Sequence, residues 1–71
     1  MASPKFRVSA YIGRDEKAAH TTNNRAIADI MFDDFKTKYP RVAMHKLARI
    51  DQGVAVYDVL KTYDKGANDG Q

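Results

Sequence analysis

Three segments of this chain alternate between apolar and polar side chains, and this alternation restricts the fold more than any other feature of the sequence. In residues 5–14 the even positions Phe6, Val8, Ala10 and Ile12 are apolar, and in residues 41–50 and 54–63 the even positions again carry most of the apolar side chains. Such period-two alternation is typical of a strand with one face on a core and the other in solvent. The sequence therefore predicts three half-buried strands.

A helix is predicted between the first two strands. Thr21–Asn24 contains only good N-cap residues, and Pro40 disfavours helical geometry at the residue before it, so the helix should end near Lys38. Its predicted apolar stripe consists of Ile27, Ile30, Met31 and Phe35, with Ala28 and Phe32 on the flank. Residues 14–20 are charged and show no period, which indicates a loop before the helix.

The segment Asp51–Gly53 is predicted to be the loop of a hairpin. A three-residue loop with glycine in the left-handed region places Ile50 opposite Val54 and keeps even residues opposite even residues. A two-residue loop would pair even with odd positions and mix the faces, so the three-residue loop is preferred. Further along the strands, this register gives the pairs Lys46–Asp58, Leu47–Tyr57, Ala48–Val56 and Met44–Leu60.

The predicted fold class is α+β, with the two-layer order β-α-β-β and one helix packed on one face of a three-stranded mixed sheet. The first strand, the helix and the second strand should form a right-handed crossover. The third strand is the richest in β-branched and aromatic residues, which favours the strand order 2-3-1, although 1-2-3 is left open. Residues 1–63 are expected to form a single domain, and the polar tail 64–71 is expected to be disordered.

Composition narrows the class of protein. The chain has 71 residues, a formal net charge of +3 and no cysteine, so disulfides and thiolate metal sites are excluded. No apolar run approaches the roughly 20 residues that span a bilayer, and Met1–Pro4 lacks the apolar core of a signal peptide. We therefore expect a soluble cytoplasmic protein that does not enter a membrane.

Motifs for chemistry are weak, and no catalytic residue, metal site or cofactor is predicted. Ser9, His45 and Asp58 could suggest a nucleophilic triad, but the alternation places Asp58 on the opposite face of the sheet. No cluster of His, Asp and Glu has the spacing of metal ligands, and no glycine-rich phosphate loop is present. The sequence favours a protein that is not an enzyme.

The odd-numbered face of the predicted sheet is the candidate functional surface. Its strand positions carry five cations, three tyrosines and no carboxylate, with an apolar centre around Leu47 and Tyr57. The predicted partner-binding residues are Lys5, Arg7, Tyr11, His45, Leu47, Arg49, Tyr57, Val59, Lys61 and Tyr63. An apolar centre with a charged rim is the usual pattern of a protein interface.

Two functions are consistent with this face. The first is a small regulatory or inhibitory protein that acts by occupying a partner protein with an acidic rim, in the manner of phage- or plasmid-encoded accessory regulators. The alternative is a single-stranded DNA or RNA binding module in which tyrosines stack on bases and cations hold phosphates. The protein partner is preferred because Leu47 and Val59 interrupt the aromatic surface. A homodimer formed through an open sheet edge is a third expectation.

Overall fold

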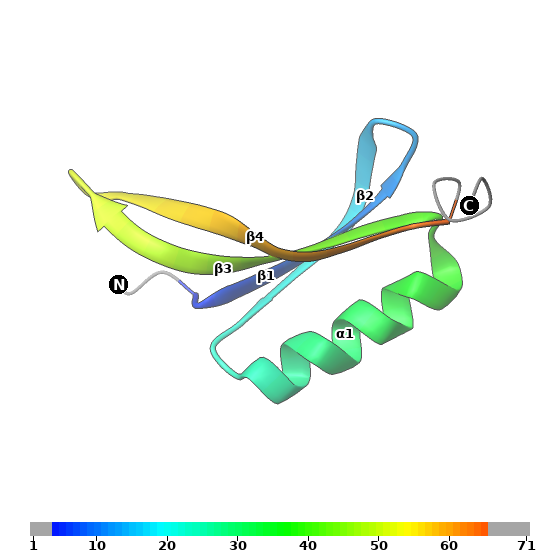
Figure 1. The fold of residues 1–71 in the computed structure, drawn as a ribbon, viewed down its shortest axis with the longest axis horizontal. Coiled ribbons are helices and arrows are strands. Elements are labelled where there is room, and N and C mark those ends of the chain that lie inside the picture. The colour runs from blue at the N-terminus through cyan, green and yellow to red at the C-terminus, as the bar shows by residue number, and fades with distance from the viewer. Residues whose placement is uncertain (1–3, 66–71) are drawn as a thin grey trace.

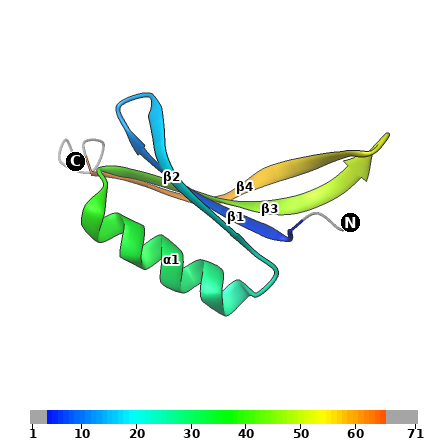
Figure 2. The ribbon, with the colours of Figure 1, turned by 180° about the vertical axis from the view of Figure 1, so that it is seen from behind.

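The computed structural model describes residues 4–65 and contains four strands and one helix (Figure 1). The elements are β1 (Phe6–Ile12), β2 (Asp15–Thr22), α1 (Arg25–Lys38), β3 (Arg41–Asp51) and β4 (Val54–Asp64). The strands form one antiparallel sheet in the order β2-β1-β3-β4, and α1 covers one face of it (Figures 1 and 2). The α+β class and the single helix on one sheet face are confirmed, whereas the three-stranded mixed sheet is wrong.

The difference comes from β2, which occupies most of the segment predicted to be a loop. A two-residue turn at Gly13–Arg14 joins it to β1, with Gly13 at φ 65° and Ile12 opposite Asp15, as expected for a type II′ hairpin. Most side chains of β2 are exposed, because β2 is an edge strand that curls away from the sheet centre; only Ala18, His20 and Thr22 are half-buried, and Ala18 packs against the core. The half-buried positions carry small or polar residues and Ala19 lies between them, so the sequence has no alternation of apolar and polar residues that could reveal the strand.

Strand β2 also changes the topology. Because β1 turns back into β2, the chain enters β3 antiparallel to β1, and the predicted right-handed crossover between parallel strands is wrong. Strand β3 lies between β1 and β4, which is the order 1-2-3 for the three predicted strands. The preferred central position of the 54–63 segment is wrong, since β4 is an edge strand. It also extends through Asp64, and residues 66–71 of the expected disordered tail lie outside the described residues.

The core lies between α1 and the two central strands. Its buried hydrophobic residues are Phe6, Val8, Ala10, Ala28, Phe32, Phe35, Val42 and Met44. Phe6, Val8 and Ala10 of β1 and Val42 and Met44 of β3 therefore face the core as predicted, whereas Ile12, at the end of β1, is 51% exposed. The helical stripe is rotated from its predicted position: Ala28 and Phe32 are at its centre, while Ile30 is 65% exposed. The larger aromatic rings bury more apolar surface than the isoleucines, which favours this rotation.

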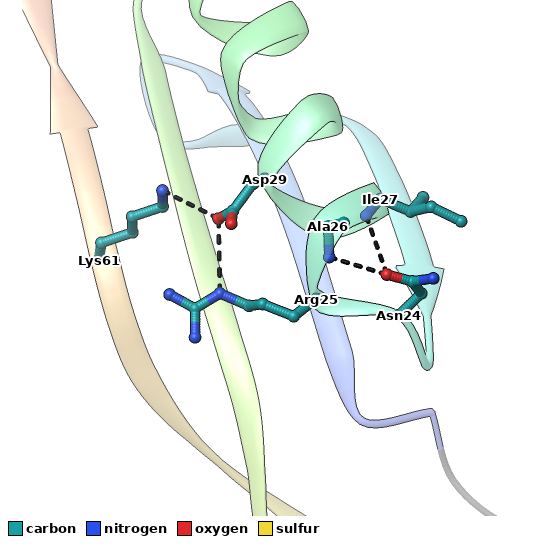
Figure 3. A network of polar contacts seen from close by, with 6 residues as sticks. All are labelled: Asn24, Arg25, Ala26, Ile27, Asp29 and Lys61. Carbon is teal, nitrogen blue, oxygen red and sulfur yellow. Dashed lines mark hydrogen bonds and ion pairs between the residues drawn. The ribbon is translucent and has the colours of Figure 1, made fainter.

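Helix α1 begins and ends where the sequence predicts. The side chain of Asn24 accepts hydrogen bonds from the backbone N–H of Ala26 at 2.8 Å and of Ile27 at 3.4 Å (Figure 3). These bonds satisfy two donors that have no partner within the helix. At the other end Tyr39 is extended, as is favoured before Pro40.

The β3–β4 hairpin has a shorter loop than predicted. Gln52 and Gly53 have φ values of 52° and 81°, so both central residues are left-handed, as in a type I′ turn. Asp51 therefore lies opposite Val54, and the predicted pairing of Ile50 with Val54 is wrong. Primed turns are favoured because their twist matches that of the flanking strands.

Two bulges then adjust the register along this hairpin. Ala48 has no opposite residue, and beyond it the predicted pairs Leu47–Tyr57 and Lys46–Asp58 are present. Leu60 is the second residue without an opposite partner, so Met44 lies opposite Lys61 and the predicted Met44–Leu60 pair is wrong, as is Ala48–Val56. Each bulge inserts one residue and reverses which positions face the helix.

The turn gives a testable prediction about stability. Gln52 is a non-glycine residue in the left-handed region, where asparagine is tolerated better than glutamine. We expect Gln52→Asn to raise the free energy of unfolding by about 0.5 kcal/mol, measured by urea denaturation. Gly53→Ala should lower it by about 1 kcal/mol through conformational strain alone, since no atom lies within 4 Å of the added carbon. A destabilising Gln52→Asn change would contradict the assigned turn.

Candidate functional site

The sheet face opposite α1, here called the open face, is the candidate site. Both hairpin ends rise on this side, so the face is concave, and none of the described elements packs across it as α1 does on the other face (Figures 1 and 2). Strand register assigns to it Arg7, Ser9, Tyr11, Ala43, His45, Leu47, Tyr57, Val59 and Thr62. Lys5 joins them, because its carbonyl accepts a 2.8 Å hydrogen bond from the N–H of Leu47, directly across the strand pair.

Seven of the ten predicted partner-binding residues therefore share the open face, and three do not. Lys61 lies opposite buried Met44 and Tyr63 lies opposite buried Val42, so both are on the helix side. Arg49 lies opposite Val56, on the face away from Tyr57. The predicted positions of Lys61, Tyr63 and Arg49 on the odd face are wrong, because the bulges at Leu60 and Ala48 reverse the alternation.

Lys61 connects β4 to the helix. Its Nζ lies 3.1 Å from Oδ1 of Asp29 (Figure 3). The same atom lies 4.5 Å from the ring centroid of Phe32. Arg25 approaches the same carboxylate at 3.5 Å. The hydrogen bond from Lys61, with the charges of Lys61 and Arg25, holds the pKa of Asp29 below its ordinary value. This cation has partners within the fold and is not presented to the open face.

We predict that Lys61→Ala lowers stability. The contact between its ammonium and the Phe32 ring should contribute about 0.5 to 1 kcal/mol at such a half-exposed site. Lys46→Ala is the matched control, because Lys46 is an exposed lysine of the same hairpin with no partner among residues 4–65. Urea denaturation should show a loss for Lys61→Ala and little change for Lys46→Ala; equal effects would contradict the role of Lys61.

The open face contains a carboxylate that the sequence pattern missed. Nη2 of Arg7 lies 2.7 Å from Oε1 of Glu16, which comes from the unpredicted strand β2. The Ser9 hydroxyl and the Arg7 guanidinium together hold the pKa of Glu16 below its ordinary value, with the charge of His45 adding to the effect. The Ser9 hydroxyl lies beside this carboxylate without the alignment of a full hydrogen bond. Glu16 thus neutralises part of a face that the sequence presented as purely basic.

Ser9 and His45 are the two members of the weak triad that share the open face. Oγ of Ser9 and Nδ1 of His45 are both buried atoms without a hydrogen-bond partner in the described part of the chain. The two atoms therefore form no hydrogen bond with each other of the kind that joins a nucleophile to its base. Asp58 lies opposite Lys46 on the other face, as the sequence predicts.

A hollow of about 250 Å³ lies at the β2 end of the open face. Its lining includes Tyr11, Arg41, His45, Val59 and Thr62. The Arg41 guanidinium lies 5.6 Å from the centroid of the Tyr11 ring, and Val59 is 61% exposed beside the hollow. Further along the same face, the hydroxyl of Tyr57 donates a 2.7 Å hydrogen bond to the carbonyl of Pro4. This bond fixes the Tyr57 ring across β3.

The rest of the described chain offers little other chemistry. Residues 4–65 contain no group of three His, Asp or Glu side chains that could hold a metal ion. Within the same residues, no helix is long and apolar enough to cross a membrane. Comparisons with known protein families, curated proteins and solved structures give no match for this chain.

The Arg7–Glu16 pair predicts a pH dependence. A carboxyl group whose pKa is lowered in the folded state stabilises the fold above its unfolded value, near 4.5, and this stabilisation is lost as the pH falls through the folded value. Both side chains are about two-fifths exposed, so the contribution should be about 0.5 kcal/mol or less and should decrease with salt. Urea denaturation of wild type and Glu16→Gln should differ at pH 7, and the difference should shrink below pH 4.5 and vanish once the pH has fallen through the folded pKa of Glu16. A difference that grows in acid would contradict this sign.

Proposed function

We propose that this chain is a non-enzymatic regulatory protein that binds a partner protein on its open face and acts by occupying the partner. The observation that carries the proposal is the concave surface on which Tyr57 is fixed, Val59 is exposed and a hollow of about 250 Å³ lies between aromatic and polar side chains. Apolar and aromatic groups at the centre with polar groups around them are the common arrangement of a protein interface.

Rigid aromatic side chains make effective anchors because little conformational entropy is lost when they bind. The hydrogen bond to Pro4 holds Tyr57 in place before any partner arrives, with Leu47 opposite it on β3. The hollow is of a size to receive a single large side chain of the partner. A large side chain that fills such a pocket can contribute much of the binding energy of an interface.

The small number of cations on the open face favours a protein partner over a nucleic-acid partner. Of the five cations that the sequence placed here, Lys61 and Arg49 lie on the other face and Arg7 is paired with Glu16. Lys5 and Arg41 remain for an acidic rim on the partner. With two or three phosphate contacts, the logarithm of affinity would fall with the logarithm of salt with a slope of only about −1.4 to −2, which is typical of weak binding.

The test compares two equally exposed apolar residues on opposite faces. Val59, at 61% exposure, lies on the open face, and Ile30, at 65%, lies on the outer side of α1. We expect immobilised wild-type protein and Ile30→Lys to capture the same protein from an extract of the cells that express the chain, and Val59→Lys to lose it. The substitutions are matched in residue type, exposure and added charge.

The extract is tested with and without nuclease to separate the two candidate partners. Capture that survives nuclease and is lost only for Val59→Lys supports a protein partner on the open face. Capture that nuclease abolishes, together with binding of fluorescent single-stranded oligonucleotides at about 50 mM salt, would replace the proposal by the nucleic-acid alternative. Equal capture by all three proteins would reject the open face as the site.

A further inference from the structure

The β3–β4 hairpin projects beyond the other described strands (Figures 1 and 2). Among residues 4–65, the end of β3 near the turn has no paired strand on the side of β1, and this stretch is here called the free edge. Strand β1 pairs with β3 only as far as Lys46, and its last bond runs from Leu47 N–H to the carbonyl of Lys5. The N–H of Lys5 then donates to Oδ1 of Asn23 at 3.0 Å instead of to β3. Within residues 4–65, no strand pairs with Arg49–Asp51 on this side.

The side chains at this free edge are chemically self-complementary. Ile50 is 57% exposed, and it is flanked by Arg49 and Asp51. Neither charged side chain has a hydrogen bond or ion pair with any other described residue. An unpaired strand edge that also exposes a large apolar side chain is a template for pairing with another chain.

We propose that a second copy of this chain pairs with this edge, so that β3 lies antiparallel to β3 of the partner about a two-fold axis at Ile50. The axis places each Ile50 beside its copy and Arg49 opposite the partner's Asp51. The symmetry repeats the contact, so two ion pairs form across one short junction. Charge complementarity selects this register: moving the axis to Arg49 or to Asp51 would place like charges opposite each other.

The backbone favours the same register. In a two-residue hairpin, Asp51 and Val54 form the closing hydrogen-bonded pair, so the N–H and C=O of Ile50 point toward the free edge. Two copies of Ile50 can then exchange both of their backbone hydrogen bonds. Arg49 and the partner's Asp51 fall in a non-hydrogen-bonded pair, where opposite side chains approach most closely.

The two outer edges of the sheet, formed by β2 and β4, are less suitable for pairing with a second copy. On β4, antiparallel self-pairing could place Asp58 opposite the partner's Lys61, but Lys61 already contacts Asp29 at 3.1 Å. The bulge at Leu60 also interrupts the ladder of β4 at that point. Strand β2 curls away from the plane of the sheet and has a bulge at Lys17.

The geometry has a consequence for binding. Opposite residues in an antiparallel pair share a face, so the two open faces of such a dimer lie on the same side of one continuous sheet. The dimer would present two open faces to a partner, which raises the strength of binding when that partner also has two sites. The self-pairing itself does not depend on what the open face binds.

A charge exchange tests the pairing. The edge is short, so dissociation is expected between about 10 µM and about 1 mM, a range accessible to sedimentation equilibrium. Arg49→Asp or Asp51→Arg should each weaken self-association by at least about tenfold, because each places like charges opposite each other twice. The double variant Arg49→Asp/Asp51→Arg should restore it to within about threefold of wild type. Circular dichroism verifies that each variant is folded.

Asp58→Arg is the matched control, because it makes the same kind of change on the same hairpin away from the proposed junction. It should leave self-association unchanged. A wild-type protein that stays monomeric at about 1 mM, or a double variant that is no better than the single ones, would overturn the proposal. Dissociation caused by Asp58→Arg and not by the Arg49 or Asp51 changes would transfer the junction to the edge of β4.

A cross-link gives an independent readout. The chain has no cysteine, so Ile50→Cys introduces its only thiol, and opposite residues in such a pair have Cα atoms about 5.5 Å apart, within the range of a disulfide. Mild oxidation should convert Ile50→Cys to a covalent dimer. Val59→Cys, at similar exposure on the open face, should remain mostly monomeric. Equal cross-linking of the two variants would contradict the two-fold axis at Ile50.

Discussion

The two-residue turn at Gln52–Gly53 is the constraint on which the sidedness of the β3–β4 hairpin depends. A left-handed pair of residues matches the twist of the strands, but it places odd positions opposite even ones at the tip. Ala48, which has no residue opposite it, shifts the pairing of β3 with β4 by one position and restores the register that a three-residue loop would give. Leu60, the second residue without an opposite partner, shifts the pairing once more. The face that each hairpin side chain occupies is therefore set by a turn and two bulges together. Sidedness in turn decides which cations bind within the fold and which are available to a partner.

The sequence predicts those parts of the fold in which one face of an element is buried. Phe6, Val8 and Ala10 on β1, and Val42 and Met44 on β3, alternate because the helix covers every second residue. Strand β2 shows no contrast between an apolar and a polar face, because an edge strand that is mostly exposed tolerates polar residues on both faces. Its charged sequence therefore resembles a loop. The bulges are equally difficult to predict, because an inserted residue leaves no mark on composition and moves every following side chain to the other face.

The same reasons explain how much of the candidate site could be predicted. Arg7, Tyr11, His45 and Leu47 share a face through the regular pairing of β1 with β3, so this part follows from alternation alone. Tyr57 joins them because the unpaired Ala48 offsets the shorter turn and restores the predicted Leu47–Tyr57 pair. Lys61 and Tyr63 lie beyond the bulge at Leu60 and were assigned to the wrong face. Glu16 was missed because its strand was not predicted, although it contributes the carboxylate that pairs with Arg7.

The distribution of charge separates stabilising contacts from recognition. Lys61 ties β4 to α1 through Asp29, and Arg7 ties β1 to β2 through Glu16, so these two cations hold elements together. Arg49 and Asp51 have no such partners among the described residues, although they lie two positions apart on a strand edge. An exposed charge without a partner in the fold costs little, because solvent stabilises it, and it remains available to an opposite charge on another molecule. The free edge of β3 and the open face therefore remain as the two surfaces whose chemistry the fold itself does not satisfy.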